Sequence, residues 1–150
     1  MIGDSLLRPT DRDIVTLSAA PTRLAFLTSG SGASTAITAS SGTVPTDECW
    51  VIAGCGLVIT PGAAQFAQFA IVDVIEPISG AQIARVAYAA APELGATVAQ
   101  QTGFARALTN LVVMPGEALR ATGNFNAGAA ANTVQFNFYG IRIPRANMLK

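Results

Sequence analysis

Residues 57–62 read Leu-Val-Ile-Thr-Pro-Gly, and residues 111–116 read Leu-Val-Val-Met-Pro-Gly. In both places an uncharged, strand-like run ends at a proline and glycine, and another extended segment follows. Proline fixes φ and lacks an amide donor, while glycine accepts the backbone angles of a sharp corner, so the pair ends one strand and starts another. The repeated strand, corner, strand unit predicts a β-sandwich built for assembly.

The strand signal continues toward the C-terminus. Val134, Phe136 and Phe138 alternate with polar residues, which is the period-two pattern of a strand with one buried face. Beyond Gly140 the apolar character passes to Ile141 and the residues that alternate with it. This change of parity predicts a bulge or bend at the glycine.

Residues 48–59 are apolar at both parities. Trp50, Ile52 and Val58 fall on one parity, and other large apolar residues fall on the opposite one. Such a strand is covered on both faces, either at the centre of a sandwich or against a neighbouring subunit. We therefore predict that these three residues contribute to a subunit interface.

The remaining body segments also have strand character. Residues 64–76 are rich in β-branched side chains, residues 84–91 lie at strand length between turn residues, and residues 117–124 alternate, with 126–131 as a loop. The count from residue 44 onward is about eight short strands, which is typical of a jelly roll. The predicted fold is an all-β, jelly-roll-like antiparallel β-sandwich with an extended N-terminal arm.

Three segments follow from the distribution of charge and small residues. Residues 1–28 carry a dense set of charges and form a polar arm, in which 14–17 and 23–27 could each add a short strand. Residues 29–43 are rich in Ser, Gly and Thr and resemble a connector by composition, although 36–38 could form a strand. Residues 44–150 are the β-sandwich body.

The composition indicates burial beyond a single chain. The sequence is 51% hydrophobic and 12% charged, about half the charged fraction of ordinary soluble domains. So few charges leave little to solvate an isolated surface, which indicates burial in a subunit interface or a larger assembly. Together with the strand that is apolar at both parities, the low charge predicts a homotrimer. Eight of the nine basic residues are arginine, which is favoured at interfaces, although a GC-rich genome would give the same bias.

Charge and hydropathy also exclude two kinds of partner. The net charge is zero and there is no basic block, so direct nucleic-acid binding has no electrostatic source. The N-terminus lacks the apolar core of a signal peptide. The longest apolar-looking run, residues 49–72, is interrupted by glycines, a proline and glutamines, so we expect no membrane helix there.

Few residues could support catalysis or metal binding. The chain has no histidine, which removes the commonest general base and the ligands of cupin-type metal sites. Cys49 and Cys55 would lie about 20 Å apart along one extended strand, whereas a disulfide requires Cα atoms within about 7 Å, so we expect reduced, buried thiols. We expect neither an enzyme nor a bound cofactor or metal.

Several segments together resemble a known family. Residues 110–122, 126–129, 134–136 and 140–145 resemble the closing strands of small tailed-bacteriophage virion proteins, above all the capsid decoration or cement proteins with a jelly-roll body. The resemblance implies a homotrimer over threefold positions of the capsid, clamping neighbouring major capsid protein subunits through a terminal arm. It also implies a location on the virion capsid surface after synthesis in the host cytoplasm, and it offers no catalytic residues.

The arm that the resemblance implies would be residues 1–27. Its charged residues could pair with complementary residues on adjacent capsid subunits, and the candidates for capsid contact are Arg8, Asp11, Arg12, Asp13 and Arg23.

Two alternative functions remain open at this point. A host-attachment or glycan-binding module of a virion would use Trp50, Tyr88 or Tyr139 as a stacking platform. A jelly-roll enzyme would need a pocket with two convergent carboxylates.

Overall fold

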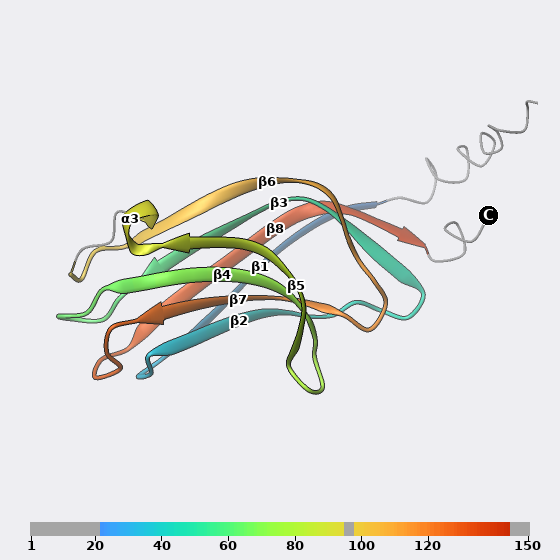
Figure 1. Cartoon of the computed structure of the whole chain (residues 1–150). Coiled ribbons are helices and arrows are strands. Elements are labelled where there is room, and N and C mark those ends of the chain that lie inside the picture. The colour runs from blue at the N-terminus through green and yellow to red at the C-terminus, as the bar shows by residue number, and fades with distance from the viewer. Residues whose placement is uncertain (1–21, 95–97, 145–150) are drawn as a thin grey trace, which may run out of the picture.

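The computed structural model describes residues 22–94 and 98–144, and the four capsid-contact candidates before residue 22 lie outside this range. The described chain consists of eight strands and one helical turn (Figure 1). Their bounds are β1 (Thr22–Gly32), β2 (Ala36–Thr43), β3 (Glu48–Thr60), β4 (Ala67–Glu76), β5 (Ala81–Ala90), α3 (Ala91–Leu94), β6 (Thr102–Val113), β7 (Ala118–Phe125) and β8 (Asn132–Pro144).

The strands form two four-stranded sheets with the orders β1-β8-β3-β6 and β2-β7-β4-β5. Every pairing is antiparallel, and β4 with β5 is the one pair of consecutive strands among those described. All other connections pass from one sheet to the other, which is the winding of a jelly roll. The predicted jelly-roll-like antiparallel sandwich is confirmed, as are strands in segments 64–76 and 84–91.

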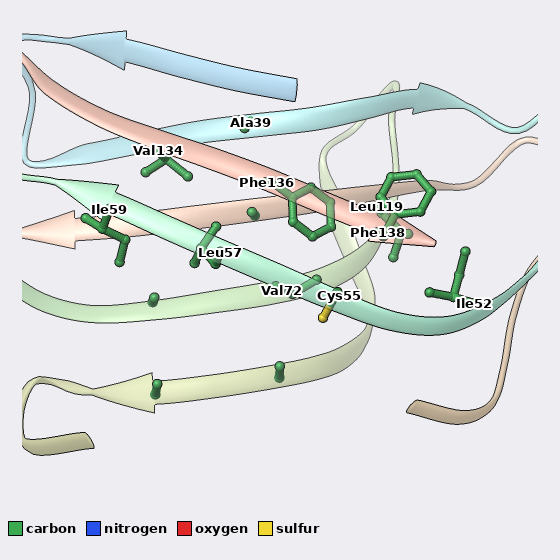
Figure 2. Close-up of a cluster of buried hydrophobic side chains, with 14 of the residues drawn as sticks. Ala39, Ile52, Cys55, Leu57, Ile59, Val72, Leu119, Val134, Phe136 and Phe138 are labelled. Carbon is green, nitrogen blue, oxygen red and sulfur yellow. The ribbon is translucent and has the colours of Figure 1, made fainter. Parts of the chain in front are cut away.

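The core lies between the two sheets and is built around the aromatic residues of β8 (Figure 2). Phe136 and Phe138 are 0% and 2% exposed, and their ring centroids are 5.5 Å apart. Trp50 packs on Phe138 from β3 at 5.7 Å, and Phe26 stacks on it from β1 at 5.3 Å. Burial of each large side chain stabilises the fold by about 1.5 to 3 kcal/mol, so this cluster holds three strands of one sheet against the other.

The predicted connector at residues 29–43 is wrong. These residues lie in β1 and β2, and β1 pairs with β8 in unbroken register from Thr22 to Gly32. The backbone groups of small residues pair in a sheet as those of larger residues do. Small residues are required where the two edge strands meet, because a Cβ on Gly30 would lie 1.9 Å from the Thr38 carbonyl oxygen. The sandwich body therefore begins with β1 at Thr22 rather than at residue 44. Six of the eight described strands follow residue 44, whereas the sequence predicted about eight there.

The two-sided burial predicted for β3 is limited to the start of the strand, where Cys49 and Trp50 are both buried, because a bulge further along changes the parity. The register shifts between Ile52 and Gly54 against both neighbouring strands. Trp50 and Ile52 before the bulge therefore face the same core as Leu57 and Ile59 after it. The strand needs no cover from a second subunit at these core positions.

The bulge or bend predicted at Gly140 of β8 lies instead in the neighbouring strand β3, opposite this glycine. The alternation of β8 continues through Gly140, so that Tyr139 and Ile141 are both exposed on the outer face. The bulge is in β3, where Ile52 pairs with Gly140. A Cβ at Gly140 would lie 2.0 Å from the carbonyl oxygen of Val51, so the glycine permits close backbone contact.

A buried amide fastens three loops at one end of the sandwich. Asn132 is 0% exposed, and its Oδ1 accepts a hydrogen bond from the Gly62 amide at 2.8 Å. Its Nδ2 lies within hydrogen-bonding distance of the carbonyl oxygens of Ser34 and Ala127, at 2.9 and 3.1 Å, and of Gln65 Oε1, at 3.1 Å. One side chain thus joins the β1–β2, β3–β4 and β7–β8 loops, at the left of Figure 1.

Candidate assembly surface

The outer surface of the β1-β8-β3-β6 sheet lacks charge over its whole central area. Three cross-strand rows define this surface, which we call the charge-free face, and the registers place each row directly beside the next. The rows are Ala25, Tyr139, Gly54 and Ala107; Leu27, Asn137, Gly56 and Ala105; and Ser29, Gln135, Val58 and Gly103.

The charge-free face exposes large apolar side chains. Leu27 is 71% exposed, Tyr139 53% and Val58 37%, and the remaining positions are alanines, glycines and short or amide side chains. Scattered exposed apolar residues are ordinary, whereas a contiguous patch of this kind marks an interaction site.

The surface of the face has a ridge and hollows. Tyr139 and Asn137 lie across the neighbouring strand, since a Cβ at Gly54 would be 2.5 Å from Tyr139 Oη and one at Gly56 would be 2.4 Å from Asn137 Oδ1. These two side chains form the β8 ridge. A hollow of about 500 Å³ lies on the β3 and β6 side, lined by Gly56, Gly103 and Ala105 among others, and we call it the β3–β6 trough. A hollow of about 320 Å³ lies on the β1 side.

The structure separates the predicted interface residues. Val58 lies in the charge-free face and is exposed, so its assignment to a subunit interface stays a prediction. Trp50 and Ile52 are 5% and 1% exposed inside the chain's own core, so their assignment to a subunit interface is corrected. The buried Trp50 cannot serve as a glycan-stacking platform either, and its Nε1 donates a hydrogen bond to Glu48 Oε1 at 2.7 Å.

Arg23 is exposed near the start of β1, paired with Ile141 at the border of the charge-free face. It is the one proposed arm contact within the described residues. Asn137 and the two glycines beneath the ridge were not identified from the sequence. The period-two spacing of Gly54 and Gly56 in the uncharged part of β3 is a signal that could have indicated a flat outer surface.

The outer surface of the other sheet is different in character. Asp73 has the outward parity of β4 but is only 1% exposed, and Arg85 Nε donates a hydrogen bond to its Oδ1 at 2.9 Å. Arg120 lies beside Asp73 on β7. Tyr88, 48% exposed, stacks on Phe69 with ring centroids 6.1 Å apart. This surface carries both charges and an exposed aromatic pair, so the two faces suit different partners.

The cysteines are not joined by a disulfide, as predicted. Burial raises the pKa of the Cys49 and Cys55 thiols, and Arg106 partly offsets this rise for Cys55. Among residues 22–94 and 98–144 no three His, Cys, Asp or Glu side chains gather as metal ligands. Within the same part of the chain, no helix is both long enough and apolar enough to span a membrane.

No protein-family model and no curated protein sequence matches the chain. Among solved structures, it is similar to a chain of the Bacillus endospore appendages, described as disulfide-linked pili, with 15% identity, a TM-score of 0.41 and coverage of 83% of this chain and 88% of that one. A chain of the infectious bursal disease virus Gt strain is similar with 15% identity and a TM-score of 0.44. The match covers 85% of this chain and 34% of that one.

A chain from the acid-stable capsid of a Helicobacter pylori bacteriophage gives 7% identity and a TM-score of 0.35, with coverage of 82% of this chain and 98% of that one. Structural neighbours therefore include capsid and other virion chains. Identities of 15% or less with TM-scores below 0.5 are too low to transfer a function.

Proposed function

We propose that this chain is a structural virion protein that decorates a tailed-bacteriophage capsid and stabilises it by bridging major capsid protein subunits. The observation that carries the proposal is the charge-free face, a contiguous surface suited to burial in an assembly, on a chain with only 12% charged residues. The jelly-roll strand order is compatible with this role but does not by itself select it.

The proposed mechanism is stabilisation by mass action. A protein that binds only the assembled lattice adds its binding free energy to the stability of that lattice. Three copies on one rigid trimer would bind at high effective concentration, so the attachment would be stronger than a single contact provides. The proposal assigns no catalytic step and no cofactor to the chain.

The proposed role of the N-terminal arm follows from the chain's path. Residues 1–21 lead into β1, which is an edge strand of the sheet that carries the charge-free face. Arms that extend from this edge would reach adjacent capsid subunits, where their charged residues would find partners. Exposed ion pairs contribute only about 0.2 to 1 kcal/mol each, so several would have to act together.

Removal of residues 1–13 tests this role. We expect the truncated protein to keep its fold and its oligomeric state, because the described core begins at Leu24, and to lose binding to its particle in co-sedimentation. Truncated protein that decorates particles with unchanged affinity would show that the contact lies on the sandwich alone.

The virion assignment itself is tested on purified particles of the virus that encodes the chain. Immunogold labelling with antibodies against the protein should mark intact capsids, and quantitative mass spectrometry should find it in a fixed ratio to the major capsid protein. Its absence from washed particles, or a ratio that varies between preparations, would refute the assignment.

One observation favours a second candidate, a host-attachment or glycan-binding module. Tyr88 and Phe69 present a stacked aromatic surface beside the polar side chains of Thr122 and Asn124. Aromatic faces of this kind bind sugar rings. A glycan array with the wild-type protein and Tyr88→Ala decides the matter: sugar binding that the substitution abolishes supports this candidate, and an array without signal rejects it.

A further inference from the structure

The twelve residues of the charge-free face form a single surface that no other described part of the chain covers. They contain no Asp, Glu, Lys or Arg, although the opposite sheet carries Asp73, Arg85 and Arg120 on its outer surface. Charged residues are depleted at the centre of protein interfaces relative to the rest of the surface. Two copies of this face can meet without bringing like charges together and without desolvating any charge.

The surface features of the face are complementary to each other. The β8 ridge, formed by Asn137 and Tyr139, stands beside the β3–β6 trough on the same surface. The residues that line the trough include Gly56, Gly103 and Ala105, whose small side chains leave room for an aromatic ring. The face therefore carries a raised strip and a hollow side by side.

The area of the face is sufficient for a stable contact. Four strands about 4.8 Å apart, and four rows of outward residues about 6.8 Å apart, give a surface of roughly 520 Å². The four rows are the three of the charge-free face and the uncharged flanking row that contains Thr133, since the other flanking row carries Arg23. Two such surfaces together reach about 1,050 Å², just above the roughly 1,000 Å² that a specific interface clears.

We infer that the charge-free face is the surface through which copies of this chain associate, with the β8 ridge of each copy lying in the β3–β6 trough of its neighbour. A contact between two different parts of the surface closes into a ring when the rotation allows it. In the homotrimer of the proposed function, each copy then contacts one neighbour through its β8 ridge and the other neighbour through its β3–β6 trough. The inference rests on the proposed function only for the number of copies.

The test is the mass of the full-length protein in solution, by light scattering after size exclusion and by sedimentation equilibrium at several concentrations. Wild-type protein should have three times the chain mass at micromolar concentration. Tyr139→Glu places a charge on the ridge and should weaken association at least tenfold. Tyr88→Glu is the matched control on the other sheet, with similar exposure, and should leave the mass unchanged.

A second pair keeps the test decisive if Tyr139→Glu disturbs the fold. Ala105→Glu fills the trough from the exposed edge strand β6, and Ala36→Glu makes the same change on the exposed edge strand β2. Circular dichroism and thermal melting should show that all four variants are folded. Dissociation by the β8 or β6 substitution alone supports the inference.

Two results would overturn it. Wild-type protein that is a monomer at all concentrations would show that no second copy occupies the face, whether it is then open or covered by residues 1–21 of its own chain. An oligomer that survives folded Tyr139→Glu and Ala105→Glu would place the contact elsewhere. Neither measurement requires a particle, so a failure here leaves the virion assignment to be judged on purified capsids.

Discussion

Replacing Asn132 by alanine should strongly destabilise the sandwich, because this buried side chain joins three loops. The side chain is fully buried and joins three loops through one accepted hydrogen bond and an amino group within reach of three oxygen acceptors. In Asn132→Ala the Gly62 N–H, which donates at 2.8 Å, has no acceptor from this side chain. A buried donor without a partner costs about 1 to 3 kcal/mol.

The lost amino group adds to this cost. Gln65 is 2% exposed, and its Oε1 loses the donor that lies 3.1 Å away, which costs about another 1 to 2 kcal/mol. The sum is about 2 to 5 kcal/mol, a large part of the roughly 5 to 15 kcal/mol that stabilises an ordinary domain. We expect the midpoint of urea unfolding to fall sharply at an unchanged m-value.

The assay is urea unfolding followed by tryptophan fluorescence, which reports on the single, buried Trp50. Protein concentration must be held constant, because association shifts apparent stability. Asn124→Ala is the matched control, since Asn124 is half-buried on the outer parity of β7, and it should lower stability by less than about 1 kcal/mol. A loss below 1 kcal/mol in Asn132→Ala would refute the reasoning that this amide fastens the loops.

Further predictions concern backbone contact, thiols and pH. Gly140→Ala should destabilise the fold by about 1 to 3 kcal/mol and lower the melting temperature, because the new Cβ meets the Val51 carbonyl. Gly32→Ala should change the melting temperature little, because the nearest atom to its new Cβ would be 3.5 Å away, and equal effects of the two substitutions would contradict close contact at Gly140. Native protein should react slowly with iodoacetamide at pH 8, because raised pKa values keep the thiols of both cysteines protonated, and unfolded protein in urea should take up two labels per chain. Intact mass spectrometry counts the labels in both states, and rapid labelling of the native protein would contradict this prediction. Hydrogen bonds from the Ser79 hydroxyl and the amides of residues 78 and 79 lower the pKa of Glu76, so the carboxylate stabilises the fold above its ordinary pKa of 4.5 and this stabilisation is lost as the pH falls through the lowered pKa. Glu76→Gln should therefore be less stable than wild type at pH 7 and equal to it at low pH, and a difference that does not change with pH would argue against this.

The fold could be predicted from local patterns wherever one strand carries a complete signal. The alternation of Val134, Phe136 and Phe138 identifies β8, and the proline corners at residues 61 and 115 mark the ends of β3 and β6. Gly116 has a φ of 88°, which fits the sharp corner that the Pro115-Gly116 pair predicts. These features are local, so the sequence displays them directly.

Features that depend on distant partners could not be predicted. Residues 29–43 look like a connector because their side chains are small, yet their strand structure comes from backbone pairing with β7 and β8, about a hundred residues later. The bulge at residue 53 changes the parity of β3, and no residue there announces it. Trp50 and Ile52 were assigned to an interface for that reason.

The candidate surface was predictable only in part. Val58 and Tyr139 were both named from the sequence, but for different roles and without any indication that they lie on one face. That juxtaposition requires the register of β8 against β3, which sets Val58 opposite Gln135 and Gly54 opposite Tyr139. A surface shared by four strands belongs to the topology rather than to any one segment.

Electron cryomicroscopy of the native particle would show the proposed attachment itself. A decorating role predicts density for this jelly roll on the outer surface of the capsid, in groups of three around threefold positions. The charge-free face should be turned toward the neighbouring copies, and residues 1–21 should reach adjacent major capsid protein subunits. A capsid reconstruction at side-chain resolution with no density for the chain would contradict a decorating and bridging role.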